Sequence, residues 1–161
     1  MAEPAVLNAS PLIFLANAGL IDLIELAGEP LFIPRAVVEE IEKFGPADTT
    51  VLAVKQSSLF NVVETGPTPP IIERWDLGPG ESSVLNWAYN HPGTIAILDD
   101  LAARRCANLL GIRVYGTLGL ILLGKRRQII PEVKPILERL KKSGMYLSDQ
   151  VINRALKLIG E

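Results

Sequence analysis

Four separate segments of the chain carry amide or carboxylate side chains beside a short apolar run or at the start of a helical pattern. The residues are Asn8, Glu40, Glu81, Asp99 and Asp100. Carboxylates that share a crevice repel each other, and a hard divalent cation such as Mg²⁺ or Mn²⁺ is their usual partner. Such a cation lowers the pKa of bound water and stabilises charge on a phosphodiester under attack. If the segments converge, they suit metal-assisted hydrolysis of a phosphate ester.

Short apolar runs alternate with helical patterns along the chain. Strands are predicted at 5–7, 31–33, 60–63, 94–98 and 112–115. Ser10 is a good N-cap and Pro11 suits a first helical position, so an apolar helical stripe is expected from there to Leu26. Further helices are predicted from Pro34, over 50–57, 78–89 and 101–110, then over 117–127, 131–142 and 148–158.

This alternation predicts an α/β fold with a central parallel sheet of about five strands and helices on both faces. Ligands of such open sheets bind beyond the carboxyl ends of the strands. Asn8 and Ser10 follow the first strand, and Asp99 with Asp100 ends the fourth. Segments distant in sequence are therefore expected to meet in one crevice.

Composition limits the class of protein. The 161 residues carry a formal charge of −2 and one cysteine, Cys106, which excludes an intrachain disulfide. A single domain is expected over 1–161, with a core at about 4–127 and a helical extension at about 131–159. The first residues do not resemble a signal peptide, and no apolar run is long enough to span a bilayer. We therefore expect a cytoplasmic protein with no membrane association.

Five segments together resemble the successive signatures of PIN-domain proteins. The resemblance extends to a prokaryotic branch of predicted nucleic-acid-binding proteins that is akin to the toxin ribonucleases of toxin–antitoxin pairs. The segments are NASPLIFLA from Asn8, FIPRAVVEEI from Phe32, LGPGESSVL from Leu77, ILDDLAAR from Ile97 and YGTLGLIL from Tyr115. Each segment alone is a weak signal, but their order and spacing over nearly the whole chain are specific. The fold implied is a PIN-like three-layer sandwich.

The resemblance implies roles for individual residues. Glu40, Glu81 and Asp100 match the second, third and fourth acidic residues of the family pattern, and Asp99 is a neighbour that could share the role. Asn8 stands where the nuclease pattern has its first aspartate. An amide oxygen can still ligate a cation, but it brings no charge, and fewer charged ligands mean weaker binding. The metal set implied is Asn8, Glu40, Glu81, Asp99 and Asp100, and the catalytic set is its four carboxylates.

Three further residues are candidates for substrate binding. Ser10 could hold a water or ligand, and Arg104 could contact a phosphate or balance the carboxylates. Thr117 with Gly116 suits a helix start that receives a phosphate, although a plain helix cap is equally compatible with them. The activity implied is a Mg²⁺- or Mn²⁺-dependent ribonuclease. RNA is the implied substrate, and an antitoxin-like protein partner and a homodimer are implied too.

Each candidate also has a structural interpretation. Glu40 could be a solvated helix residue, and Glu81 could serve only to complement a helix dipole. Asp99 or Asp100 could cap the helix that follows, and Asn8 could be a turn residue bonded to nearby backbone. These readings leave open a second function, in which the fold persists without strong activity because of Asn8. Such a module would bind nucleic acid or a partner protein.

Two other doubly wound folds fit poorly. A phosphoacceptor receiver would need acidic residues after the first strand and a lysine after the fifth, where this chain has Asn8 and Gly116-Thr117. A dinucleotide-binding domain would need a glycine-rich turn after the first strand, where this chain has Asn-Ala-Ser-Pro. His91 is expected to be an exposed turn residue and Cys106 a buried one, so Cys/His catalysis is not indicated.

Overall fold

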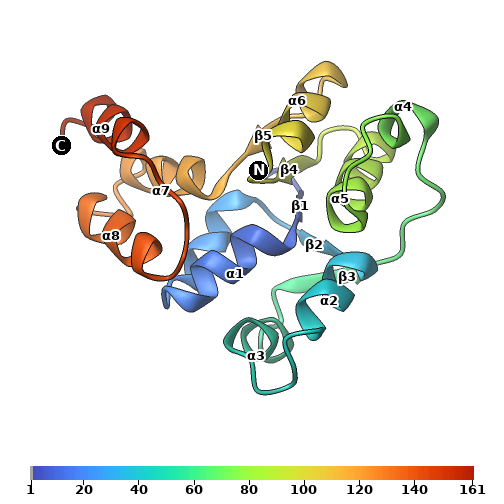
Figure 1. The fold of residues 1–161 in the computed structure, drawn as a ribbon, viewed down its shortest axis with the longest axis horizontal. Coiled ribbons are helices and arrows are strands. Elements are labelled where there is room, and N and C mark those ends of the chain that lie inside the picture. The colour runs from blue at the N-terminus through green and yellow to red at the C-terminus, as the bar shows by residue number, and fades with distance from the viewer. Residues whose placement is uncertain (1) are drawn as a thin grey trace.

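A parallel sheet of five strands forms the centre of the molecule, which we describe for residues 2–161 from a computed structural model (Figure 1). The spatial order of the strands is β3-β2-β1-β4-β5, and every neighbouring pair is parallel. The strands are β1 (Ala5–Leu7), β2 (Leu31–Pro34), β3 (Phe60–Val63), β4 (Ile95–Ile97) and β5 (Val114–Tyr115). The predicted fold class and strand number are thereby confirmed.

The two central strands are fully buried, which explains their unbroken apolar sequences. The register pairs Leu7 of β1 with Ile97 of β4. The chain runs outward from β1 through β2 to β3, and then crosses back to β4 and β5. The order therefore reverses between β1 and β4, and the carboxyl ends of these strands flank a topological switch point. In open α/β sheets this is the usual place for a ligand site.

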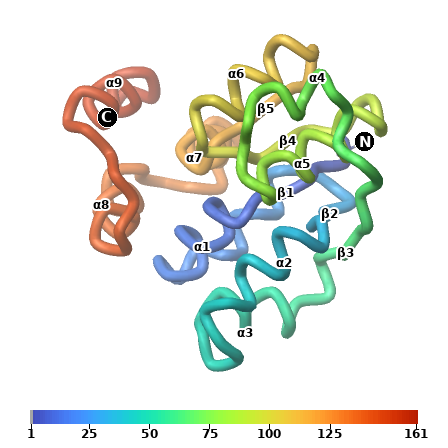
Figure 2. Tube along the Cα trace, turned by 45° about the vertical axis from the view of Figure 1, so that its right-hand side comes forward, coloured from blue at the N-terminus to red at the C-terminus, as the bar shows by residue number. Residues whose placement is uncertain are grey.

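Helices cover both faces of the sheet (Figures 1 and 2). On one face α1 (Ala9–Asn17) contacts α7 (Thr117–Arg126) and the 3₁₀ helix η1 (Ile21–Ala27). On the other, α5 (Pro79–Asn90) contacts α6 (Leu101–Leu109), α4 (Pro70–Glu73) and three strands. The helix α2 (Arg35–Glu42) contacts both α1 and α5, and α3 (Thr49–Gln56) packs on α1. This is the three-layer arrangement that the sequence predicts.

The first helical segment differs from the prediction in two ways. The apolar stripe predicts one helix to Leu26, but α1 ends at Asn17 and the stripe continues in η1. Gly19, whose φ is +70°, makes the break because that backbone conformation cannot continue a helix. The prediction that Ser10 is the N-cap is wrong, since Asn8 holds that position. The side chain of Asn8 makes no capping hydrogen bond and is free to point elsewhere.

Two helices, α8 (Lys134–Lys142) and α9 (Asp149–Leu158), follow α7 and lie on the side of the molecule away from α4 and α5 (Figures 1 and 2). The guanidinium of Arg139 on α8 donates to the carbonyl oxygen of Ala18 at the end of α1. The Glu161 carboxylate accepts hydrogen bonds from the Val133 and Lys134 amides and pairs with Lys125 Nζ at 3.4 Å. Glu161 thus ties the end of the chain to the start of α8. No helix of residues 2–161 is both long and apolar enough to cross a membrane.

Candidate functional site

Asn8 lies at the carboxyl end of β1, where its side chain is only 1 % exposed. Its Nδ2 donates to Glu81 Oε1 at 3.2 Å, whereas its Oδ1 is buried without any hydrogen-bond partner. The opposite amide orientation would set Oδ1 against the Glu81 carboxylate, so the charge on Glu81 fixes the orientation seen. Asn8 is therefore not a turn residue bonded to its own backbone. A buried carbonyl oxygen left unpaired costs about 1–3 kcal/mol and needs a physical reason.

Gly80 allows this orphaned oxygen to lie close to the start of α5. A Cβ on residue 80 would lie 2.8 Å from Asn8 Oδ1 and 2.7 Å from Glu40 Oε2. Two oxygens from distant segments therefore approach the Gly80 backbone more closely than any side chain at this position would allow. Gly80 is a position that the sequence alone did not single out. Its signal is a glycine at the second position of α5, where alanine would favour the helix by about 1 kcal/mol.

Glu40 occupies the second turn of α2 and its oxygen points toward Asn8 and Gly80. Partial burial raises the pKa of the Glu40 carboxyl above its ordinary value, and the nearby negative charge of Glu81 raises it further. The Lys43 ammonium acts in the opposite direction but does not reverse the shift. We call Asn8, Glu40, Gly80 and Glu81 the Asn8 cluster. Without a cation, this cluster holds two carboxylates and an unpaired carbonyl oxygen in mutual repulsion.

Replacing Glu40 by glutamine is expected to stabilise the cation-free protein at neutral pH. A raised pKa in the folded state means that the native protein resists ionisation of this carboxyl, so stability is lost as the pH rises through the folded pKa. The Glu40→Gln variant should unfold at a modestly higher temperature than the wild type at pH 7 in EDTA. The two proteins should converge below the ordinary glutamate pKa of 4.5. A difference that grows toward acid pH would contradict the assigned cause.

Asp99, which follows β4, anchors the start of α7. Its Oδ1 accepts from the Thr117 amide at 2.8 Å and its Oδ2 from the Thr117 hydroxyl at 2.7 Å. Thr117 is fully buried, and its amide and its hydroxyl both donate to this carboxylate. The negative group at the start of α7 is therefore the Asp99 carboxylate, which also complements the dipole of this helix.

Replacing Asp99 by asparagine should loosen this anchor. An amide can accept only one of the two hydrogen bonds, and its NH₂ would face the other Thr117 donor. We expect a loss of about 2 kcal/mol, which is a fall of about 5 °C in melting temperature for a chain of this size. Calorimetry of the cation-free protein measures this directly. An unchanged melting temperature would show that the Asp99–Thr117 contact does not hold α7.

Asp100 lies beside Asp99 but serves a different element. Its Oδ2 accepts from the Ala103 amide at 2.9 Å and so caps α6, while the residue remains exposed. Of the two predicted neighbours, Asp100 is the helix cap and Asp99 faces inward. Arg104, on the next turn, brings Nη1 to 3.1 Å from the point where a Cβ on Gly116 would lie, and Asp99 Oδ1 is 3.0 Å from that point. We call Asp99, Arg104, Gly116 and Thr117 the Asp99 cluster.

The structure thus places six of the eight predicted residues in two groups at the same edge of the sheet, and Ser10 and Asp100 belong to neither group. The Asn8 cluster combines segments from β1, α2 and α5, and the Asp99 cluster combines β4, α6 and α7. Ser10, in the first turn of α1, is half-buried and makes no side-chain hydrogen bond within residues 2–161. In the same part of the chain, no three Asp, Glu, His or Cys side chains gather closely enough to hold a metal ion by themselves.

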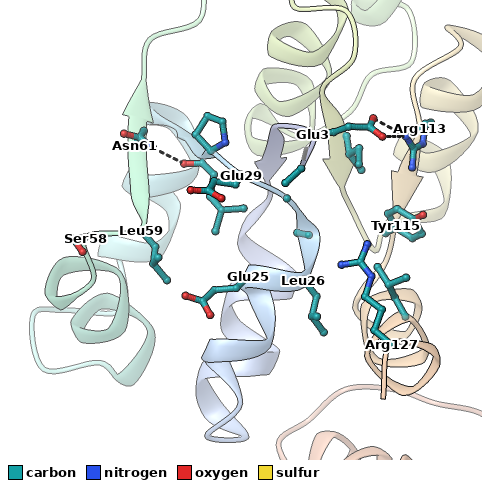
Figure 3. Close-up of a pocket in the computed structure, with 17 residues that line it drawn as sticks. Glu3, Glu25, Leu26, Glu29, Ser58, Leu59, Asn61, Arg113, Tyr115 and Arg127 are labelled. Carbon is teal, nitrogen blue, oxygen red and sulfur yellow. Dashed lines mark hydrogen bonds and ion pairs between the residues drawn. The ribbon is translucent and has the colours of Figure 1, made fainter. Parts of the chain in front are cut away.

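A cavity of about 520 Å³ lies at the opposite edge of the sheet, beside the amino ends of the strands (Figure 3). The starts of β2, β3 and β4 line it, and the ion pair between Glu3 and Arg113 closes part of its rim at 2.6 Å. Glu25 and Glu29 lie across this cavity from Arg127 (Figure 3). None of the predicted site residues lines it. The predicted site residues therefore lie away from this cavity.

The remaining chemistry-bearing side chains match their structural interpretations. Cys106 is buried on α6, and burial raises the pKa of its thiol, which makes it a poor nucleophile. His91 is exposed after α5, where its ring stacks on Trp87 at a centroid distance of 3.8 Å. Trp87 also packs against Phe32. These contacts leave the two acidic clusters as the candidate site.

Comparison with known proteins agrees with this picture. A search of the curated proteins finds no match to the chain. A family model described as a PIN domain matches residues 4–161, which include every candidate site residue. The parallel five-stranded sheet, covered by helices on both faces, is the architecture expected for that family. The chain belongs to the PIN-domain family.

Proposed function

We propose that this protein is a ribonuclease that depends on Mg²⁺ or Mn²⁺ and hydrolyses RNA phosphodiester bonds. PIN domains are a nuclease-like family that generally uses divalent metal ions. The observation that supports the proposal most strongly is the buried Asn8 Oδ1, which has no hydrogen-bond partner and lies beside Gly80 together with Glu40 Oε2. A cation bound to these two oxygens would pair the orphaned oxygen and reduce the repulsion around it.

The donors of the Asn8 cluster suit a hard cation. Every available ligand atom is oxygen, from one amide and two carboxylates, and oxygen is what Mg²⁺ and Mn²⁺ prefer. Asn8 and Glu40 would hold the ion, and Glu81 would orient Asn8 through its hydrogen bond while adding negative charge. Because Asn8 is neutral, the site has one charge fewer than an all-carboxylate set. We therefore expect weak binding, in the range where millimolar cation is needed.

The residues that follow β4 would supply position and charge. Asp99 fixes α7 through Thr117, and Asp100 keeps its Oδ1 available because the α6 cap uses only Oδ2. Arg104 would contact a substrate phosphate beside Gly116. When bound, the cation would polarise the phosphodiester and lower the pKa of a water molecule. The carboxylates of the chain would hold that water in line and accept its proton.

One observation favours a second candidate, a module that binds nucleic acid or a partner protein with little or no cleavage. Asn8 donates a hydrogen bond to Glu81, which an aspartate could not do without a proton. This hydrogen bond offsets part of the repulsion around Glu81 when no cation is bound. In this reading, the neutral residue stabilises the fold at the expense of cation affinity.

Cleavage of a labelled single-stranded RNA in millimolar Mn²⁺ tests the proposal. Wild-type protein should cleave it, and Asp100→Asn should lose activity on the order of 100-fold, the scale on which partners of a metal site act. Asparagine caps helices as well as aspartate does, so α6 should keep its start. Glu73→Gln on exposed α4 is the matched control and should cleave normally. If wild-type protein cleaves nothing, the binding module is the better account. If Asp100→Asn cleaves normally, Asp100 has no part in the site.

A further inference from the structure

The charge of the chain is strongly segregated. Residues 125–161 hold nine Lys and Arg against four Asp and Glu, a formal charge of +5. Residues 1–124 hold seven against fourteen, a formal charge of −7. The near-neutral total therefore hides a basic C-terminal portion, made of the end of α7 with α8 and α9, attached to an acidic body. This portion lies on the side of the molecule away from α4 and α5 (Figures 1 and 2).

Most of these basic side chains are exposed and unpaired. Within residues 2–161, Lys125 is the one basic residue of the C-terminal portion that pairs with a carboxylate. Leu137 and Leu140 bury one face of α8, which leaves Lys141 and Lys142 exposed at its end. Cations at a helix C-terminus complement the dipole, but that effect does not require the excess found here. The surface is therefore free to meet a polyanion.

An exposed aromatic ring follows the two lysines closely in the sequence. Tyr146, in the loop between α8 and α9, is 88 % exposed, which is unusual for a large apolar ring. Gly144, with φ of +102°, makes the turn that separates Tyr146 from Lys142. Exposed aromatic side chains within a basic surface are the usual elements of sequence-tolerant binding to single-stranded nucleic acid.

We propose that the α8–α9 loop and its basic flanks dock single-stranded RNA, with Lys141 and Lys142 on phosphates and Tyr146 stacked on a base. The inference rests on the proposed function, because it names where the substrate of that site is first held. The acidic body needs such an element: a body of charge −7 repels a polyanion, and the carboxylates of the site add to this repulsion. A basic portion on the same chain overcomes it by raising the local concentration of RNA.

Fluorescence anisotropy with a labelled single-stranded 12-mer RNA in EDTA measures docking without cleavage. Lys141→Ala with Lys142→Ala should weaken binding about tenfold or more at low salt. It should also lower the slope of log affinity against log salt by about 1.4, the loss of two phosphate contacts on a single strand. Tyr146→Ala should weaken binding by about tenfold, through one lost stack, without changing the salt slope. Lys55→Ala with Arg74→Ala removes the same charge from the acidic body and should bind as wild type.

The outcomes separate this inference from the proposed function. If wild-type protein binds the RNA but never cleaves it with Mn²⁺, the ribonuclease proposal fails and the docking surface stands. If it cleaves, and the Lys141/Lys142 variant binds as tightly as wild type, the docking surface is wrong and the ribonuclease stands. Equal losses in the Lys55/Arg74 control would reduce the effect to net charge and overturn the proposal. Failure of wild-type protein to bind RNA at low salt would also overturn it, and would point to a protein partner for this surface.

Discussion

Asn8→Asp is expected to destabilise the cation-free protein and to strengthen its response to Mn²⁺. The substitution replaces the Nδ2 donor by a carboxylate, which loses the hydrogen bond to Glu81 and sets two like charges together in a buried position. Losing a hydrogen bond to a charged group destabilises the fold, and so does burying an unpaired charge. We expect the free energy of unfolding to fall by about 3 kcal/mol in total. In thermal unfolding with EDTA, the melting temperature should fall by roughly 10 °C.

Addition of Mn²⁺ should offset part or all of this loss of stability. A cation that binds only the folded state stabilises it by an amount that grows with the ratio of its concentration to its Kd. An extra negative ligand lowers that Kd, so the rise in melting temperature at millimolar Mn²⁺ should be larger in Asn8→Asp than in wild type. Asn153→Asp, on the exposed face of α9, makes the same chemical change outside the site and should show neither effect. Equal rises in all three proteins would mean that residue 8 does not contact the cation.

Gly80→Ala is expected to abolish the response to the cation while leaving the fold intact. The new methyl group would lie 2.7 Å from Glu40 Oε2 and 2.8 Å from Asn8 Oδ1. Glu40 can swing outward because it is exposed, but Asn8 is buried and held by Glu81. The methyl group would thus push apart Glu40 and Asn8, the two residues proposed to hold the ion. We expect the Mn²⁺-dependent rise in melting temperature to disappear and RNA cleavage to fall to background.

A second helical glycine gives the matched control. Gly119 lies within α7, and a Cβ there would meet its nearest neighbour, the Tyr115 ring, at 3.4 Å, which is an ordinary contact. Gly119→Ala should keep both the cation response and cleavage. The decisive comparison is at saturating Mn²⁺, where the folded fraction of each variant is verified by circular dichroism. If folded Gly80→Ala still responds to Mn²⁺ as wild type does, the cation lies elsewhere.

The architecture could be predicted from the sequence because its signals are local. Short unbroken apolar runs such as Ala5–Leu7 and Ile95–Ile97 are typical of strands in the middle of a buried sheet, and both strands are fully buried. Strand order and the switch point then bring Asn8 and Asp99 to one edge. The break after α1 could not be predicted from the apolar stripe, because η1 continues the same burial with a tighter helix. A single glycine, Gly19, decides where the first helix ends.

The separate roles of the site residues could not be predicted from the sequence. Asp99 and Asp100 are adjacent and chemically identical, and only the positions of Thr117 and Ala103 decide which one anchors α7 and which one caps α6. The importance of Gly80 also depends on contacts between elements. A side chain at residue 80 would clash with Asn8, after β1, and with Glu40 on α2. The spacing of residues within one segment gives no information about a contact between two segments. The orphaned oxygen of Asn8 is likewise visible only once its neighbours are placed.

The most direct test of the cation site is anomalous X-ray scattering from crystals soaked in millimolar Mn²⁺. An anomalous peak is expected beside Gly80, bonded to Asn8 Oδ1 and to a Glu40 oxygen. The peak should be absent from crystals of Gly80→Ala. No peak at that point in well-diffracting wild-type crystals, with Asn8 Oδ1 instead bonded to an ordered water, would contradict the proposed cation site.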